Sequence, residues 1–182
     1  CGSNTADVII VKEGHTESVA SQIDFTGHAG MTILGLGSGS TRPRFTCTAD
    51  INMIAVAAAD IHFENLYFPA ATVAREERAT IKVTAGGCHI ENCYFQLGNY
   101  DHAEAGVTCG VWLAAGGDRA EVRACSFVAS GTVQPDAGLH CNSNLAGLRI
   151  IGNTFDGGSI GWKSGNASLL IATSAPTYPR LW

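Results

Sequence analysis

The sequence predicts an all-β fold, a single-stranded parallel β-helix of about five to six coils that occupies residues 1–182 as one domain. The first observation is a short phrase that recurs with a phenylalanine at its end. Its copies are residues 63–68, 90–95, 122–127 and 150–155, and their closing phenylalanines fall 27, 32 and 28 residues apart. Self-similarity at a period of 20 to 50 residues indicates stacked repeats.

The second observation is a three-residue alternation of apolar, variable and apolar residues ahead of each phrase. It occurs at 54–56, 81–83, 111–113 and 139–141, with a looser copy at 169–171. This period of two predicts a short strand with one buried face, and the small or polar residues that follow predict a turn. The intervals leave no room for a crossover helix. We therefore expect two or three strands per coil, with equivalent residues about 4.8 Å apart on successive coils.

Two N-terminal segments extend the repeat. Residues 33–37 lie one period before the phrase at 63–68, so we expect them to form the same strand one coil earlier. The apolar run at 8–11 is then the start of the lowest coil. This reading predicts five coils and leaves room for a sixth near the C-terminal end.

Composition narrows the classes of function. Charged residues make up only 15% of the chain and glycine occurs 22 times, which suits a turn-rich β fold. The net charge of −5 argues against a nucleic-acid groove. We find no apolar stretch that approaches 18 residues and no signal-peptide pattern, and we expect neither a membrane span nor a cofactor. Because the chain starts with Cys1, we expect a fragment or a processed product.

The seven cysteines are predicted to be reduced. The repeat places most of them in slots that other coils fill with apolar residues: Cys88 matches Ile61, and Cys93 matches Leu66. Free cysteine fills such interior positions well. We therefore expect small core side chains rather than a disulfide framework, and assembly in a reducing compartment. The set that this argument covers is Cys88, Cys93, Cys109, Cys125 and Cys141.

The first residues allow two interpretations. Cys1 followed by small polar residues is compatible with a lipid-anchored mature lipoprotein. The alternative is that the chain simply begins at this residue, and we favour this alternative.

Outward residues at one repeat position should form ladders. One predicted ladder runs through His62, His89, Glu121 and Arg149, and a second through Glu64, Glu91, Arg123 and Ile151. They would place two exposed ion pairs, Glu121 with Arg149 and Glu91 with Arg123, on neighbouring coils. Glu64 and Glu91 would be the paired carboxylates of a hydrolase in the catalytic interpretation. We favour the alternative that the repeat alone brings them together.

Two further ladders follow from the phrase itself. Asn65 and Asn92 are expected in left-handed turns with their amides bonded along the ladder, and the four phenylalanines in a buried stack. Tyr67 and Tyr94 point the opposite way. They are candidates for contact with a sugar ring or a neighbouring subunit.

Irregular segments are where function would be added. Insertions are predicted at 96–108 and 130–136, and the first contains Asp101, His102 and Glu104. These residues are possible metal ligands or catalytic acids, but the pattern has low specificity. The glycine-rich run at 35–40 lacks the Lys-Ser/Thr ending of a phosphate-binding loop, so we reject that function. The sequence contains no zinc-type spacing of cysteine and histidine.

Several segments resemble known β-helices. The phrases at 90–95 and 150–155 resemble the coil repeat of the pectate-lyase-like superfamily, which implies a right-handed helix. Val11-Lys12-Glu13-Gly14-His15-Thr16-Glu17, followed by the segment 33–45, is similar to tailed-phage β-helix proteins with Gly-His-Thr-Glu and Gly-Leu-Gly-x-Gly-x-x-Arg-Pro-x-Phe segments. The calcium-binding aspartates and catalytic arginine of pectate lyases have no match here, which argues against lyase activity.

The resemblance implies a bacteriophage virion protein, assembled in the host cytoplasm, that decorates a capsid or forms part of a tail spike or fibre. Such proteins are commonly trimers that contact other virion proteins and, in some cases, a host surface glycan. The tail at 174–182, with Tyr178, Leu181 and Trp182, is then expected to dock on another subunit. The alternatives are a polysaccharide lyase or glycosidase that uses Glu64, Glu91, Asp101 or Glu104, and a carbohydrate-binding lipoprotein anchored through Cys1.

Overall fold

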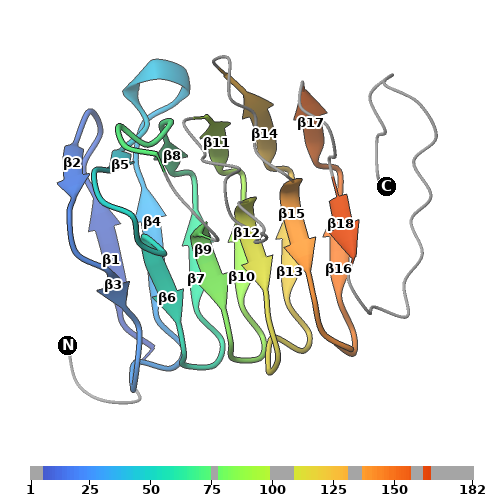
Figure 1. The fold of residues 1–182 in the computed structure, drawn as a ribbon. Coiled ribbons are helices and arrows are strands. Elements are labelled where there is room, and N and C mark those ends of the chain that lie inside the picture. Colours follow the sequence, from blue (N-terminus) through green and yellow to red (C-terminus); the bar gives the residue numbers. More distant parts are fainter. Residues whose placement is uncertain (1–5, 75–77, 99–108, 131–136, 157–161, 165–182) are drawn as a thin grey trace.

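The chain forms a parallel β-solenoid, as the repeat predicts (Figure 1). This computed structural model describes residues 6–74, 78–98, 109–130 and 137–156, and the backbone of 162–164. Three consecutive strands make one coil, and six such triplets follow one another along the axis. Strand pairing between coils is parallel throughout the described residues.

Equivalent strands of successive coils build three six-stranded sheets. In spatial order, sheet A contains β1 (Val8–Val11), β4 (Thr32–Gly35), β7 (His62–Glu64), β10 (His89–Glu91), β13 (Glu121–Arg123) and β16 (Arg149–Ile151). Sheet B contains β2 (Thr16–Val19), β5 (Arg44–Cys47), β8 (Tyr67–Phe68), β11 (Tyr94–Leu97), β14 (Ser126–Ala129) and β17 (Thr154–Asp156). Sheet C contains β3 (Ile23–Asp24), β6 (Ile54–Val56), β9 (Ala79–Val83), β12 (Cys109–Leu113), β15 (Ala137–Cys141) and β18 (Trp162–Ser164).

The register between coils confirms the predicted alignment of the N-terminal segments. Ile33 pairs with Phe63, and Ile9 pairs with Ile33, so β1 begins the first coil. The sixth coil differs in one strand from the prediction. Sheet C ends with β18 at 162–164, which pairs with Leu139–Cys141, whereas the predicted copy at 169–171 lies outside the described residues. The apolar-variable-apolar pattern does not identify β18, because its sequence, Trp-Lys-Ser, ends in a polar residue.

Two columns of left-handed residues turn the chain at the corners of the coil. At the corner before sheet A, the residue two positions ahead of each strand has positive φ in five coils: Gly30, Asp60, Gly87, Arg119 and Gly147. The corner between sheets A and B carries the second column: Asn65, Asn92, Ala124 and Gly152. Glycine and asparagine adopt this conformation most easily, which explains their recurrence in the repeat.

The core is built from side chains stacked in register. Phe68, Phe95, Phe127 and Phe155 form the predicted stack, with ring centroids 4.9, 4.8 and 5.0 Å apart and interplanar angles of 25°, 7° and 9°. Phe45 extends the column toward the first coil at 6.4 Å from Phe68. Each ring covers the next, so burial of apolar area is continuous along the axis.

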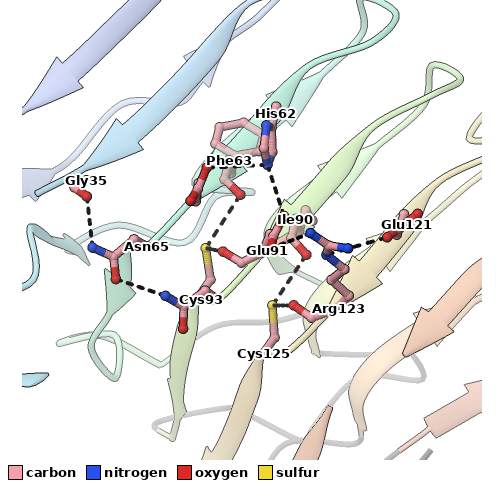
Figure 2. Close-up of polar contacts among 12 residues, drawn as sticks. Gly35, His62, Phe63, Asn65, Ile90, Glu91, Cys93, Glu121, Arg123 and Cys125 are labelled. Carbon is pink, nitrogen blue, oxygen red and sulfur yellow. Dashed lines mark hydrogen bonds and ion pairs between the residues drawn. The ribbon is translucent and has the colours of Figure 1, made fainter. Parts of the chain in front are cut away.

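The six described cysteines are free and buried, as the repeat predicts for the interior ones. The thiol of Cys93 donates to the carbonyl oxygen of Glu91 at 3.3 Å, and that of Cys125 to Arg123 at 3.3 Å (Figure 2). Cys109 is buried in a column of small apolar residues, as its parity predicts. It lies at the start of β12 and packs with Ala79 and Ala137 beside Trp112, apart from the main core.

One polar residue occupies the core slot of Cys93 and Cys125 on the last described coil. Asn153 is 1% exposed, yet both ends of its amide are bonded. Its Oδ1 accepts from the amide of Cys125 at 2.9 Å, and its Nδ2 donates to the carbonyl oxygen of Val122 at 2.8 Å. A buried amide so satisfied ties the last two coils together at little desolvation cost.

The one described helix is the 3₁₀ turn η1 (Gly39–Thr41), which fills the longer connection between β4 and β5. Across the described residues, we find no helix with the length and apolar character to pass through a membrane.

Candidate functional site

The outer face of sheet A carries the predicted ladder of charged side chains. His62, His89 and Glu121 pair in register, as do Glu64, Glu91 and Arg123. The parallel pairing of β7, β10, β13 and β16 places these outward residues on adjacent rungs, so the sequence spacing alone brings them together (Figure 2).

Ion pairs link the ladder across three coils. Arg123 Nη2 lies 2.6 Å from Glu91 Oε1, and its Nε lies 3.7 Å from Glu121 Oε1. Arg149 Nη1 reaches Glu121 Oε2 at 3.1 Å. The hydrogen bond and charge of Glu91, followed by the charge of Glu121, raise the pKa of Arg123 above its ordinary value.

Both predicted ion pairs are therefore present, but the prediction that both are exposed is wrong for one carboxylate. Glu121 is only 7% exposed. Two guanidinium groups lie against it, those of Arg123 and Arg149, and these long side chains cover it while they balance its charge. A period-two pattern identifies an outward residue, but it does not show what its neighbours cover.

The two carboxylates of the catalytic interpretation lie on either side of one histidine. His62 Nε2 is 4.0 Å from Glu64 Oε2 and 3.8 Å from Glu91 Oε2. Glycoside hydrolysis needs one carboxyl group that holds a proton to donate. Glu91 is instead bonded to the guanidinium of Arg123, which links it to the next coil. The arrangement thus suits coil-to-coil linkage better than acid catalysis.

An asparagine ladder runs beside these charges. Asn65 Nδ2 donates to the carbonyl oxygens of Gly35 and Gly37, each at 2.8 Å. Asn92 Oδ1 accepts from Arg42 Nη2 at 2.9 Å. The side chains therefore stabilise the turn column and the connection that contains η1, which is a structural role.

The predicted tyrosine pair lies on the outer face of sheet B. Tyr67 and Tyr94 are half-buried and meet edge to face at 5.1 Å. Tyr67 donates from its hydroxyl to Gln96 Oε1 at 2.6 Å, and the guanidinium of Arg44 lies 5.1 Å from its ring centroid. Desolvation raises the pKa of Tyr67, although Arg44 opposes the shift. Because neighbouring side chains already cover the ring of Tyr67, its face is less available to a sugar.

Sheet C carries an aromatic group that the sequence reasoning missed. The Nζ of Lys82 lies 4.3 Å from the ring centroid of Trp112, and His140 lies 5.8 Å away on the next coil. Their shared rung position in the repeat could have revealed this cation–π contact.

The other predicted site residues cannot be placed. Asp101, His102, Glu104, Tyr178, Leu181, Trp182 and Cys1 all lie outside the described residues. Within the described part of the chain, no group of three or more His, Cys, Asp or Glu side chains is arranged to hold a metal ion.

Among the described residues, none covers the apolar end of the first coil. Val8, Ile9 and Ile10 are 59%, 38% and 61% exposed, although they belong to a strand. Behind them is a pocket of about 160 Å³ with a wholly apolar lining, formed by Ile9, Val11, Ile23, Phe25, Ile33, Phe45, Ile54, Phe63 and Leu66. We call this surface the open end. The unbroken apolar run at 8–11, in place of an alternation, is its signal in the sequence.

One charged residue of the first coil lies in a core column. Glu17 pairs with Phe45, so it takes the rung that the stacked phenylalanines occupy on later coils. Its side chain is 53% exposed and its carboxylate lies 3.7 Å from His15 Nε2. The phenylalanine column therefore begins at Phe45, and the open end presents a carboxylate beside an apolar pocket.

Comparison with known proteins adds no relative. The chain matches neither a protein-family model nor a curated protein nor a solved structure.

Proposed function

We propose that this chain is a structural protein of a bacteriophage virion, a β-solenoid that decorates a capsid or belongs to a tail spike or fibre and acts through protein–protein contacts. The open end is the observation that carries the proposal. Solenoids need their terminal coils covered, and an apolar pocket behind a strand with exposed Val8 and Ile10 favours coverage by protein.

The phage-like segments support the proposal because they belong to one structural unit. The amide of Gly14 donates to the carbonyl oxygen of Thr41 at 2.7 Å, and the amide of Arg44 donates to His15 at 2.8 Å. The Gly-His-Thr-Glu segment and the segment at 33–45 thus stack on each other as the first two coils. A resemblance in both segments therefore concerns a single contiguous region next to the open end.

The charged ladder supports a structural role over an enzymatic one. Arg123 pairs with Glu91 of the preceding coil, so one of the two carboxylates of the catalytic interpretation is held in an ion pair between coils. Such pairs help to fix the register of stacked coils.

The test is whether the protein is a component of phage particles. An antibody raised against the chain should detect it in phage particles purified on a density gradient, and light scattering of the pure chain should give the mass of a trimer with and without reductant. Signal confined to the soluble fraction of the lysate would refute the virion assignment. If light scattering gives the mass of a monomer, the trimer prediction is refuted but the virion assignment is not.

A further inference from the structure

We propose that the side chain directly before each strand of sheet B serves as a hydrogen-bond acceptor for the preceding coil, wherever that coil has a backbone N–H at the same position without a backbone acceptor. We call this position the capping column. Its members, from the first coil to the sixth, are His15, Pro43, Leu66, Cys93, Cys125 and Asn153. In this role Cys93 and Cys125 are polar acceptors as well as small core side chains. The role does not depend on what the protein binds.

The need for an acceptor arises at the corner between sheets A and B. The N–H of Asn92 donates to the carbonyl oxygen of Arg123 on the next coil at 3.1 Å, whereas that of Tyr94 donates to Leu66 on the preceding coil at 2.9 Å. The direction of donation therefore reverses across Cys93, and the regular parallel ladder is interrupted there. A buried N–H at such a place needs an acceptor from a side chain.

The contact is most direct at Asn153. Its Oδ1 accepts from the N–H of Cys125 at 2.9 Å, and its Nδ2 donates to the carbonyl oxygen of Val122 at 2.8 Å. The sulfur of Cys125 lies 3.5 Å from the carbonyl oxygen of Ile90, the residue that pairs with Val122. Burial and a hydrogen bond with the Cys93 thiol raise the pKa of Cys125, and a hydrogen bond from the backbone N–H of Cys93 opposes that rise. The thiol thus takes the place of the amide, as a weaker donor and acceptor.

Cys93 repeats this geometry one coil earlier (Figure 2). Its sulfur lies 3.3 Å from the carbonyl oxygen two residues before it, the same distance as for Cys125. It also lies 3.9 Å from the carbonyl oxygen of Phe63 on the preceding coil. Because the two sulfurs have equivalent positions over the coil before them, we assign Cys93 as the acceptor for the N–H of Leu66.

The apolar members of the column fit the same rule. Leu66 follows Pro43, and proline has no backbone N–H that would need an acceptor. Pro43 in turn follows His15, whose N–H donates to the carbonyl oxygen of Lys12 within its own turn at 3.2 Å. The column therefore changes from apolar to polar at Cys93, the first member whose preceding coil has an N–H to satisfy.

The experiment follows hydrogen exchange of single backbone amides by NMR. Asn153→Leu removes the acceptor and keeps a side chain of similar size, so the amide of Cys125 should exchange at least roughly fivefold faster. The amide of Ser126, which donates to the carbonyl oxygen of Cys93 at 2.9 Å, is the reference for general loosening of the coil. It should change less. Asn153→Cys installs the residue of the two preceding coils and should keep the Cys125 amide protected.

A second variant tests the thiol as an acceptor. Cys125→Val should accelerate exchange of the Cys93 amide relative to that of Tyr94. Cys141→Val is the matched control, because Cys141 is an equally buried thiol on sheet C, outside the capping column. It should leave the exchange of the Cys93 amide unchanged.

Three results would overturn the role of the column. The first is unchanged exchange of the Cys125 amide in Asn153→Leu. The second is equal acceleration of the Cys125 and Ser126 amides, which would indicate general loosening in place of a lost cap. The third is an effect of Cys141→Val on the Cys93 amide as large as that of Cys125→Val.

Discussion

Asn92 donates a hydrogen bond from its Nδ2 to the Oδ1 of Asn65 on the preceding coil at 3.3 Å. Both residues are left-handed, with φ of 50° and 58°, and they share one corner of the solenoid. The ladder stops at the next coil, where Ala124 holds the same conformation with φ of 50° and has no amide to offer. At this repeat position, Asn92 therefore has a hydrogen-bonded side chain, whereas Ala124 adopts the same left-handed conformation without one.

Replacement of Ala124 by Asn should stabilise the protein. Asparagine tolerates the left-handed conformation better than alanine, and its amide would come next to Asn92, so we expect a gain of about 1 kcal/mol in the free energy of unfolding. Chemical denaturation of wild type and Ala124→Asn measures it. Ala124→Gly is the control for the backbone contribution alone, and an Asn variant no more stable than the Gly variant would show that the ladder does not extend.

Truncation of the phenylalanine stack should be costly in its middle and cheaper at its end. Phe95 is 0% exposed and stacks on both sides, so Phe95→Ala should lower the free energy of unfolding by about 3 to 5 kcal/mol. Phe155 is 8% exposed, and Phe127 is the only phenylalanine described against it. Phe155→Ala should cost less under the same denaturation conditions. Equal losses would mean that the column does not stabilise the coils in the graded way that the packing implies.

Most of the columns could be predicted because residues one repeat apart in the sequence lie next to each other on adjacent coils. The pairing of Glu91 with Arg123 and the αL positions of Asn65 and Asn92 required nothing beyond that register. Burial of Glu121 could not be predicted, since it depends on where two arginine side chains lie. The sequence signal of the open end is only the unbroken apolar run at 8–11, and the place of Glu17 in the phenylalanine column needed the structural alignment of β2 with β5.

Substitution of Gly116 by alanine should destabilise the protein more than the same substitution of Gly14. Gly116 has a φ of +94°, and a Cβ built on it would lie 2.4 Å from the carbonyl oxygen of Thr84. Because that neighbour is backbone, Gly116→Ala should destabilise the protein by about 2 kcal/mol or more. Gly14 has a φ of +72° with nothing within 4 Å of its Cβ position, so Gly14→Ala should cost only about 1 kcal/mol. Thermal unfolding of both variants separates the clash from the conformational cost, and similar losses would contradict the close approach.

Buried thiols should make the fold sensitive to alkaline pH. Desolvation, reinforced by neighbouring Cys93, raises the pKa of Cys88 and that of Cys125 far above the ordinary value of a thiol. In the unfolded chain these thiols ionise above a pH of about 8.5, whereas in the folded chain they stay protonated. The contribution of these thiols to the free energy of unfolding is therefore fully present below that pH and is lost as the pH rises above it.

Above this pH each of the two thiols should lower the free energy of unfolding by about 1.4 kcal/mol for every pH unit. Denaturation of wild type and the double variant Cys88→Val/Cys125→Val across the alkaline range tests this, because lysines and tyrosines titrate alike in both proteins. The variant should show a shallower decline. Native thiols should also resist a thiol-reactive dye that labels them in denaturant. Equal slopes, together with fast labelling of the native chain, would mean that Cys88 and Cys125 reach water in the folded state.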